Sequence, residues 1–587
     1  MNTFRLVEDK VTTALEALKS AGELPADLDL SGVEVQEPRD SKHGDCAVNA
    51  AMVLAKRAGR KPRDIAEALK SELADDADLT KIEVAGPGFL NISFAEEVWA
   101  RLLSSVLEAG GQFGQSQIGA GKRVHIEYVS ANPTGPMHVG HCRGAVFGDA
   151  LGSLLAAAGY AVTREYYVND AGAQVDKLGQ SAFLRYREVL GEDIGEIPAG
   201  LYPGDYLKPV GQALADTYGH DLLNFRSEDQ IATARDVAIE MQLEDIKADL
   251  ESLGVAHDVF FSERSLTAGD DGDQVAEAIA LLREKGLIYE GRLSRPKGHD
   301  DDDWEDREQT LFRSTEFGDD VDRALMKSDG TYTYFAGDVA YHNNKLKRKF
   351  DLYFNVLGAD HVGYIPRLKA VVRALSDGQA DFDTPVCQLV KVVRDGQPVQ
   401  MSKRAGTFVA LRDVVDEVGR DPVRFMMLMN KSDTQIDFDL AKVVEQSKDN
   451  PVFYVQYAHA RVSSVLRNAA TVFPDLKVTT DQVSQSEIGE LTDDGERELL
   501  RQIARYPKLI ETSAREREPH RLTRYLYDLA SALHTQWARG NDSPHLRFID
   551  QDRPGVTKSR LLLVRATQLV VLSGLTILGV NAPNEMR

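Results

Sequence analysis

Residues 123–168 constrain the fold of this 587-residue chain most. Along them, a strand-like pattern is followed by a turn rich in glycine and proline, a helical pattern and a second strand-like pattern. The run RVHIEYVS at 123–130 alternates as a strand does, and residues 141–158 repeat apolar side chains at the spacing of a buried helical face. A strand-like run, YAVTREYYV, follows Gly159. This β–α–β order predicts two parallel strands of a Rossmann-type sheet.

The turn between the first strand and the helix, SANPTGPMHVGHCRG, places His138 and His141 at the helix start. Helix N-termini present unpaired N–H groups, and ligands of open α/β sheets bind beyond the carboxyl ends of the strands. The turn therefore predicts a phosphate site. Neither the GxGxxG dinucleotide pattern nor a GxxxxGK[ST] loop occurs, which argues against a dehydrogenase or a P-loop ATPase. Helix capping, or zinc binding together with Cys142, remains an alternative role for the histidines.

Other patterns divide the chain into three regions. A small α+β domain is predicted for residues 1–118, ending in the glycine-rich stretch EAGGQFGQSQIGAGKR. An α/β domain is predicted for 119–440, with an acidic, mainly helical insertion at about 175–325. Further strand candidates in this domain are 332–336, 351–358 and 388–394. Residues 441–587 carry long apolar-periodic segments and are predicted to be all helical.

Charge and cysteine content limit the functional classes. The three cysteines, Cys46, Cys142 and Cys387, form no CxxC pair, so we expect neither a disulfide framework nor a structural zinc site. The net charge is -23, yet residues 441–587 hold 20 basic and 18 acidic residues, which makes this region the expected polyanion surface. We expect no membrane association, because no run of about 18 uncharged apolar residues is found. The acidic, amphipathic start of the chain favours the cytoplasm.

Two short motifs carry a family resemblance. PMHVGH resembles the HIGH signature of class I aminoacyl-tRNA synthetases, and VQMSKRAG, about 260 residues later, resembles their KMSKS signature. The longer segments EYVSANPTGPMHVGHCRG, HGDCAVNAAMVLAK, VAGPGFLNISF, FYVQYAHARVSSVLR and LGVNAPNEM resemble arginyl-tRNA synthetases in particular, over nearly the whole chain. One departure is Gln400, which stands where the first lysine of KMSKS is found.

The resemblance implies an arginine–tRNA ligase with ATP and Mg²⁺ as cofactors. Its substrates and partners would be L-arginine, ATP and tRNA(Arg), and we expect a monomer. The fold it implies is a Rossmann-type catalytic domain with an insertion, a small α+β N-terminal domain that contacts the tRNA core, and a helical C-terminal anticodon-binding domain. Aromatic residues and arginines interleaved on the C-terminal helices suit tRNA bases and phosphates, although helix bundles also need aromatic residues in their cores.

The resemblance also assigns site residues. The catalytic residues are His138, His141 and Lys403, which would stabilise charge on the phosphates of ATP. The ATP-binding residues are Pro136, His138, Gly140, His141, Asp360, His361, Met401, Ser402, Lys403 and Arg404. The arginine-binding residues are Glu127, Asn132, His141, Tyr334 and Asp338. We expect no metal held by protein side chains, since the acidic run at 299–308 is typical of a solvated loop.

Two of these assignments keep an alternative. Asp338 could cap a helix instead, and Asp360 with His361 could form a structural turn. If the chain is helical from Ala336 onward, Tyr334 and Asp338 share one helical face, since they are four residues apart.

Overall fold

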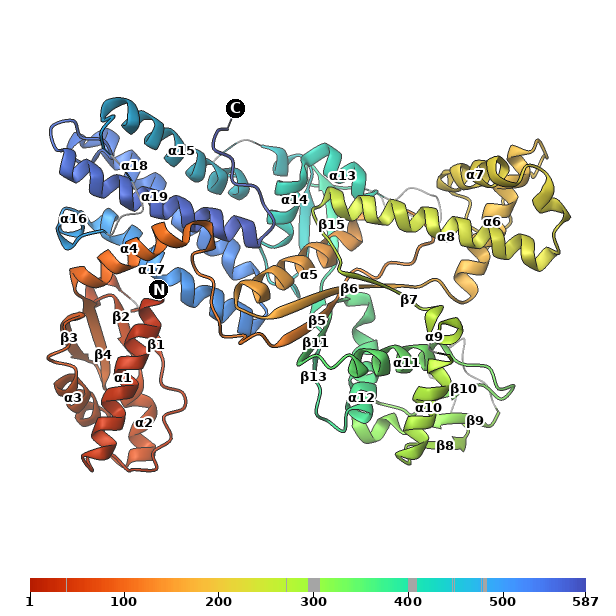
Figure 1. Ribbon diagram of the computed structural model, residues 1–587, viewed down its shortest axis with the longest axis horizontal. Coiled ribbons are helices and arrows are strands. Elements are labelled where there is room, and N and C mark those ends of the chain that lie inside the picture. The colour runs from red at the N-terminus through yellow and green to blue at the C-terminus, as the bar shows by residue number, and fades with distance from the viewer. Residues whose placement is uncertain are drawn as a thin grey trace. The chain divides into compact units, whose positions relative to one another are not determined.

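The computed structural model describes the chain except for residues 39, 271, 294–306, 400–408, 446, 448, 477, 479–482 and 587. The described residues form two compact units (Figure 1). One unit is Gly119–Glu445, and the other combines Met1–Ile118 with Gln446–Arg587.

A parallel sheet of five strands, in the order β13-β11-β5-β6-β7, is the centre of the larger unit. Its strands are β5 (Arg123–Glu127), β6 (Ala161–Val168), β7 (Val259–Ser262), β11 (Leu352–Asn355) and β13 (Asp381–Asp383). Ile126 of β5 pairs with Arg164 of β6 on one side and with Phe354 of β11 on the other. The predicted Rossmann-type sheet is confirmed, and the carboxyl ends of its parallel strands meet at one edge.

Helix α5 (Val139–Ala157) connects β5 to β6 and is buried along almost its whole length. Prolines and Gly135 keep residues 128–137 irregular, because proline has no N–H to donate to a sheet or helix. The predicted helix is confirmed, and it begins two residues early because His138 caps it. Fully buried Arg143 ties its first turn to three carbonyl oxygens, those of Gln388, Lys431 and Thr434, at 2.5–3.1 Å.

The segment between β6 and β7 is a helical subdomain with its own apolar core, in which Leu178, Tyr186 and Leu214 are fully buried. Its elements are α6 (Ala173–Val189), η3 (Asp205–Leu207), α7 (Lys208–Tyr218), η4 (Asp221–Asn224) and α8 (Ser227–Ser252). Strand β7 then joins the main sheet. The insertion predicted at about 175–325 is therefore interrupted by a strand of that sheet, whose apolar residues Val259–Phe261 are followed by Ser262 and Glu263.

After β7 the chain forms a small antiparallel sheet of order β10-β9-β8. The elements of this segment are α9 (Ser265–Ala268), α10 (Gln274–Glu284), β8 (Ile288–Gly291), β9 (Gln309–Phe312), η5 (Ser314–Phe317) and β10 (Arg323–Met326). One apolar cluster joins it to the helices that follow, with Phe312 and Leu325 fully buried beside Phe335.

The strand predicted at 332–336 is wrong, because helix α11 (Tyr334–Lys347) begins there. Thr333 caps this helix, accepting a hydrogen bond at its Oγ1 from the backbone N–H of Ala336. The alternating run Thr-Tyr-Thr-Tyr resembles a strand, but the cap and the buried face formed by Phe335, Ala336 and Val339 favour a helix.

The rest of the larger unit follows β11. The predicted strands at 351–358 and 388–394 are confirmed by β11, by β12 (Leu357–Gly358) and by β15 (Val390–Arg394). The remaining elements are β12 (Leu357–Gly358), η6 (Ala359–Tyr364), α12 (Ile365–Leu375), β14 (Val386–Cys387), β15 (Val390–Arg394), β16 (Gln397–Pro398), α13 (Leu411–Val418), α14 (Arg420–Met427), β17 (Ile436–Asp439) and η7 (Lys442–Val444).

The smaller unit begins with an antiparallel sheet of order β1-β2-β4-β3, covered by helices as predicted for an α+β domain. Its elements are α1 (Thr3–Ser20), β1 (Val35–Gln36), η1 (Ser41–His43), β2 (Cys46–Val48), α2 (Ala50–Ala58), α3 (Pro62–Glu72), β3 (Leu79–Ala85), β4 (Phe89–Phe94), α4 (Glu96–Ala109) and η2 (Gly110–Gln112).

The C-terminal part of this unit is a helix bundle, which confirms the all-helical prediction. Its elements are α15 (Pro451–Val472), α16 (Gln485–Gly489), α17 (Asp494–Glu516), α18 (His520–Asp542), η8 (Pro544–Leu546) and α19 (Pro554–Ile577). Helix α19 is long and apolar enough to cross a membrane by length and composition, but 83% of its most apolar window is buried inside the protein.

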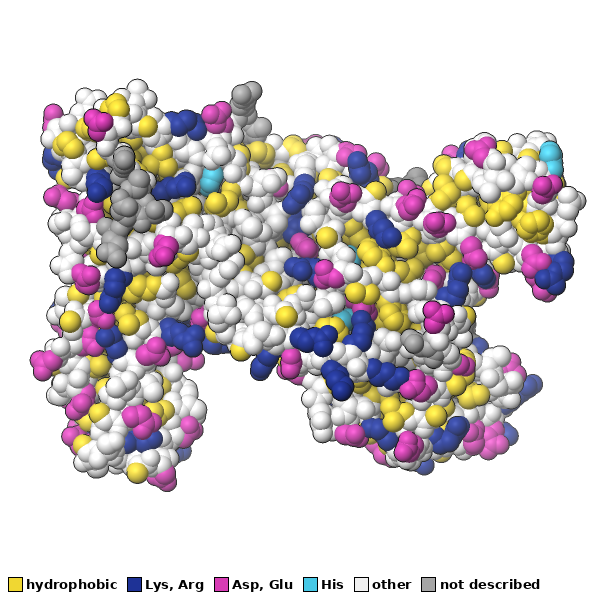
Figure 2. All heavy atoms as spheres, viewed as in Figure 1, with side chains coloured by type: hydrophobic (Ala, Val, Ile, Leu, Met, Phe, Trp, Pro, Cys, Tyr) yellow, Lys and Arg dark blue, Asp and Glu magenta, His cyan; other side chains and the backbone are white. Residues whose placement is uncertain are grey.

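A basic stripe on α17 pairs with acidic residues of the N-terminal domain. The pairs are Arg497–Glu96, Arg501–Asp45, Arg505–Glu37 and Lys508–Glu8. Figure 2 likewise shows acidic and basic side chains interspersed over the N-terminal sheet rather than gathered by sign. Much of the C-terminal positive charge therefore serves contacts within this unit, and charge balance alone overstates the polyanion surface predicted for 441–587.

Candidate active site

His138 and His141 close the first turn of α5. His138 Nδ1 accepts a hydrogen bond from Gly140 N at 3.1 Å, and His141 Nδ1 accepts one from His138 N at 3.4 Å. The two rings stack with their centroids 3.8 Å apart. Because each Nδ1 is an acceptor, the proton of each neutral ring lies on Nε2. The capping alternative is thus confirmed for His138, and capping fixes the tautomer that can donate to a phosphate from Nε2.

The zinc alternative has no structural support. Among the residues that the structure describes, no group of three or more His, Cys, Asp or Glu side chains is placed to hold a metal ion. Cys142 is buried inside α5, and burial raises the pKa of its thiol to about 12.

Gly140 is required by the position of the His138 ring. A Cβ at residue 140 would lie 2.7 Å from His138 Cε1 and 2.8 Å from its Nδ1. The ring is held there by its capping hydrogen bond, so it cannot easily move away. A side chain at this position would therefore displace the histidine.

The second motif lies outside the described residues, and with it Met401, Ser402, Lys403 and Arg404. The chain that directly follows it contacts the first motif. Val139 N donates to Val409 O at 3.1 Å, and Leu411 N donates to Met137 O at 2.9 Å. These hydrogen bonds form a short antiparallel bridge between His138 and Ala410.

Asp360 and His361 lie in η6, which follows the carboxyl end of β11 and the short strand β12. Their side chains are 68% and 63% exposed, and His361 Nε2 is 3.5 Å from Asp360 Oδ2. Pro136 lies in the irregular segment before α5 and is partly buried.

Glu127 and Asn132 lie at the carboxyl end of β5. Lys345 Nζ donates to Glu127 Oε2, and Ser130 Oγ donates to Glu127 Oε1 at 3.2 Å. Asn132 Nδ2 donates to Gln174 Oε1 at 2.8 Å, and the Asn132 residue itself is exposed. The structure thus fixes the Glu127 carboxylate from both sides.

The backbone between these two residues is strained. Val129 and Ser130 have φ values of 71° and 43°, in the left-handed region that residues other than glycine seldom adopt and that β-branched valine avoids most. Such conformations cost on the order of 1–3 kcal/mol each and persist at functional sites. Hydrogen bonds hold the strained turn, because Ser130 Oγ accepts from Tyr167 N at 3.0 Å and Ser130 O accepts from Asn169 Nδ2 at 3.1 Å.

Tyr334 and Asp338 lie on the first turns of α11. Asp338 is not a helix cap, since Thr333 has that role, and it accepts a hydrogen bond from the Tyr364 hydroxyl. Tyr334 is 58% exposed, and its ring lies 3.3 Å from where a Cβ on Gly172 would be. The tyrosine therefore covers the start of α6.

Glu263, which the sequence reasoning missed, lies beside Asp338. It directly follows β7, and its Oε1 lies 3.8 Å from where a Cβ on Gly337 of α11 would be. The available signal was an apolar strand, VFFS, ending in a carboxylate inside a region assigned to an insertion. Acidic residues at the carboxyl ends of parallel strands are site candidates.

Asp170 also lies near Glu263. Its Oδ2 accepts from Ser262 Oγ at 2.6 Å, and its Oδ1 accepts from Arg264 N at 2.9 Å. The four carboxylates Glu127, Asp170, Glu263 and Asp338 are called the acidic cluster below.

Two members of the acidic cluster have strongly raised pKa values. Burial raises the pKa of Asp338 to about 6; the hydrogen bond from Tyr364 opposes this, and the charge of Glu127 adds to it. Burial also raises the pKa of Glu263 to about 7, with further contributions from Asp338 and Asp170. Perturbed carboxylates at a strand edge are typical of a functional site, and these would be stabilised by a cationic ligand.

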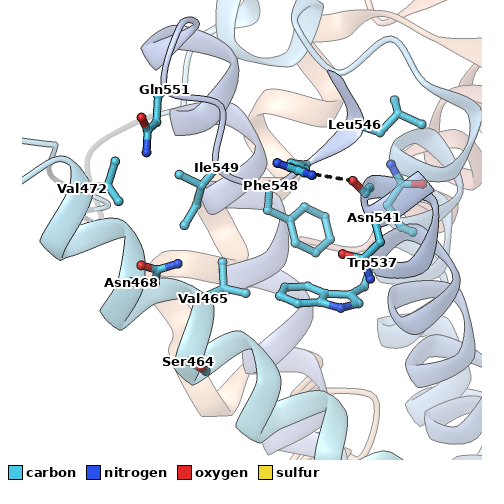
Figure 3. Close-up of a pocket in the computed structure, with 13 residues that line it drawn as sticks. Ser464, Val465, Asn468, Val472, Trp537, Asn541, Leu546, Phe548, Ile549 and Gln551 are labelled. Atoms are coloured by element: carbon cyan, nitrogen blue, oxygen red, sulfur yellow. Dashed lines mark hydrogen bonds between the residues drawn. The ribbon is translucent and has the colours of Figure 1, made fainter. Parts of the chain in front are cut away.

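A second candidate site lies in the C-terminal helix bundle, where a cavity of about 350 Å³ opens between α15, α18 and the segment after η8 (Figure 3). Trp537 and Phe548 face it with ring centroids 6.0 Å apart, and the amides of Asn468, Asn541 and Gln551 surround them. An aromatic cavity with amide donors and acceptors suits a flat polar ring.

The interleaved aromatic residues of the C-terminal helices divide between core and surface. Tyr525 is buried, and His459 Nδ1 is 2.9 Å from the carbonyl oxygen of Pro583. Tyr457 is 46% exposed, and the Arg461 guanidinium lies 4.5 Å from its ring centroid and 5.0 Å from that of Trp537.

Comparison with known families gives three matches along the chain. Residues 5–94 match the family described as arginyl tRNA synthetase N terminal domain. Residues 102–187 and 303–465 match tRNA synthetases class I (R), catalytic domain, and residues 455–586 match the DALR anticodon binding domain.

Two proteins that this chain resembles along nearly their whole length are both named arginine–tRNA ligase. The chain is 57% identical over 587 residues to an arginine–tRNA ligase of Methylobacterium sp. (strain 4-46), covering 100% of both. It is 57% identical over 582 residues to an arginine–tRNA ligase of Nitrobacter hamburgensis, covering 98% of this chain and 97% of that one.

Two solved structures have a similar fold. A putative arginyl tRNA synthetase of Campylobacter jejuni matches with a TM-score of 0.71 and 30% identity, over 84% of this chain and 100% of that one. The Thermus thermophilus arginyl-tRNA synthetase, at 22% identity and a TM-score of 0.71, is similar in fold over 99% of this chain and 100% of that one.

Proposed function

We propose, for a chain that belongs to the arginyl-tRNA synthetase family and is an arginine–tRNA ligase, that the acidic cluster binds L-arginine and the start of α5 binds ATP. The observation that carries this assignment is the position of the carboxylates. They lie at the carboxyl edge of the sheet, and β5, which carries Glu127, leads directly into the turn that ends at His138.

Arginine has two cationic ends, and the acidic cluster offers carboxylates for both. A guanidinium is planar with five N–H donors, so Asp338 and Glu263 can accept from it while the ring of Tyr334 lies against its face. The α-ammonium group would bind Glu127 and Asn132, and His141 would border the carboxylate. Lysine would leave acceptors of such a site unpaired, which disfavours it.

The activation step joins the arginine carboxylate to the α-phosphate of ATP and releases pyrophosphate. In this assignment His138 and His141 donate from Nε2 to the crowded phosphate, and Gly140 lets the nucleotide approach the helix start. Pro136, Asp360 and His361 would contact ATP, as would Met401, Ser402, Lys403 and Arg404. The terminal adenosine hydroxyl of tRNA(Arg) then attacks the arginyl carbonyl, and AMP leaves. Mg²⁺ would accompany ATP, held mainly by phosphates and water.

The remaining roles follow the domains. We assign residues 1–118 to the tRNA core, 119–440 to catalysis and 441–587 to the anticodon. The exposed Tyr457, with the half-buried Arg461 against its ring beside the cavity at Trp537, supports an anticodon surface there. We further propose a monomer that works in the cytoplasm, where its three free, buried cysteines would stay reduced.

Two measurements test this assignment. Charging total tRNA with each amino acid in turn should give incorporation of arginine alone. His141→Ala should slow adenylate formation by roughly 10² or more and leave tRNA affinity nearly unchanged. His220→Ala, at an exposed position of the helical subdomain, is the matched control and should keep normal activity. An equal loss of adenylate formation and tRNA affinity in His141→Ala would show a structural role instead.

A further inference from the structure

One cation is buried directly beneath the acidic cluster. The side chain of Lys345, on α11, is only 1% exposed. Its Nζ donates to Glu127 Oε2 of β5 and, at 2.9 Å, to Asn355 Oδ1 of β11. The same ammonium group lies 4.2 Å from the ring centroid of Tyr341. One side chain of α11 thus contacts the ends of two neighbouring strands.

A contribution to fold stability does not readily explain why a lysine is buried at position 345. Burial lowers the pKa of Lys345, and the carboxylates of Glu127 and Glu165 oppose this. A buried ion pair adds little stability relative to well-packed apolar side chains of similar volume, because both charges lose their hydration. What distinguishes this ion pair is that its carboxylate, Glu127, is the one proposed to bind the substrate.

The contacts of Glu127 leave room for a ligand. Lys345 occupies one lone-pair position on Oε2, and Ser130 occupies one on Oε1 at 3.2 Å. A carboxylate has about four such positions, so about two remain for the N–H groups of an ammonium ion. Asp338 precedes Lys345 by two helical turns and shares its face of α11, so one helix presents a carboxylate at one end of the acidic cluster and its internal cation at the other.

We infer that Lys345 is a positioning residue for arginine binding, whose buried ammonium group fixes the Glu127 carboxylate in the orientation that accepts the α-ammonium group of the substrate. The inference rests on the proposed role of Glu127. Lys345 acts through Glu127 and does not itself contact the substrate.

The test is a double-mutant cycle in the full-length protein, with KM for arginine, KM for ATP and kcat measured during aminoacylation of tRNA(Arg). Glu127→Gln should raise KM for arginine about 10- to 100-fold, the usual effect of losing a charged hydrogen bond. Lys345→Met should raise it by a similar factor and change KM for ATP less than about threefold. The KM for arginine of the double variant should exceed that of the more severe single variant by no more than about threefold. The two effects should not multiply, because both substitutions disable the same carboxylate.

Lys345→Arg keeps a cation and should recover at least about tenfold of the lost arginine affinity relative to Lys345→Met. Arg323→Met is the matched control, because Arg323, on β10 of the antiparallel sheet, also forms an ion pair with a buried carboxylate, that of Asp319. It should lower the melting temperature without changing KM for arginine. If Lys345→Met does not fold, Lys345→Gln replaces it in the cycle.

Three outcomes would overturn the inference. The first is a normal KM for arginine in folded Lys345→Met or Lys345→Gln. The second is a double variant whose defect is the product of the two single defects. The third is an absence of recovery in folded Lys345→Arg. A normal KM in Glu127→Gln would instead contradict the proposed function of Glu127, which separates the two failures.

Discussion

The two ends of the acidic cluster differ in how their charge is balanced. At the β5 end, Glu127 already pairs with Lys345 inside the protein. At the other end, Asp338 raises the pKa of Glu263 and Glu127 raises that of Asp338, and among the described residues neither Asp338 nor Glu263 forms a salt bridge. The first end is complete without ligand, whereas at the second the charges of Arg367 and Lys345 favour ionised Asp338 without forming a salt bridge to it. The end proposed to bind the guanidinium is therefore where we expect binding and protonation to be coupled most strongly.

The largest effect is expected from removing the charge at the incomplete end. Asp338→Asn keeps the shape of the side chain but leaves the guanidinium without its buried partner, which typically costs about 3–5 kcal/mol. We expect kcat/KM for arginine to fall by about 10²- to 10⁴-fold. Asp329→Asn, in an exposed turn of the same unit, is the control and should have normal kinetics. Normal arginine kinetics in Asp338→Asn would place the guanidinium elsewhere.

A smaller effect is expected from pH, and only at the incomplete end. With pKa values of about 7 for Glu263 and about 6 for Asp338, Glu263 becomes mostly protonated and Asp338 about half protonated as the pH falls from 8 to 6. If both must be ionised to bind a guanidinium, kcat/KM for arginine should fall about 20-fold over this range. Glu263→Gln should lower the value at pH 8 and flatten the profile. A profile that is flat in the wild type would contradict the assignment.

The same two groups shift fold stability in the opposite direction. Their pKa values are raised in the folded protein, so the stability they contribute is fully present below about pH 4 and is lost as the pH rises through 6 to 7. Arginine affinity and the stability contribution of these two groups should therefore respond to pH with opposite signs, and thermal unfolding of Glu263→Gln should show less of this loss than the wild type.

The smallest effect is expected from Tyr364→Phe. The Tyr364 hydroxyl donates to Asp338 and holds the pKa of that carboxyl lower than burial alone would. Its loss should raise KM for arginine by about 3- to 10-fold and move the acidic limb of the pH profile to higher pH. Unchanged KM and profile would mean that Asp338 is positioned by its helix alone.

The sequence pointed to the Glu127 end of the acidic cluster more completely than to the end formed by Asp338 and Glu263. Glu127 and His138 lie in or next to a continuous motif, so the resemblance assigns roles to both, and the β–α–β order predicted the edge where they lie. Glu263 follows a four-residue strand inside a region assigned to an insertion, and only the pairing of β6 with β7 brings it to Asp338. The start of α11 was mistaken for a strand because alternation outweighed the capping role of Thr333.

Counting charges along the sequence predicts a binding surface only in part. The net charge of residues 441–587 indicates a surface for a polyanion, but it does not show which cations already have partners. Arg539 pairs with Asp493, and Arg560, almost fully buried, pairs with Glu496. Pairing depends on tertiary contacts that composition does not record, which is why we propose the exposed Tyr457, with Arg461 against its ring, as the anticodon surface rather than the basic region as a whole.

The basic stripe on α17 also has a consequence for how the chain is made. It joins residues that are about 400 to 500 positions apart, such as Glu96 with Arg497 and Glu8 with Lys508. At synthesis rates of about 5–20 residues per second, the N-terminal sheet leaves the ribosome roughly 20–80 s before its partner helix exists. The carboxylates that pair with α17 are therefore made well before their partners, and the docking of α17 is expected to be a late, slow step in maturation.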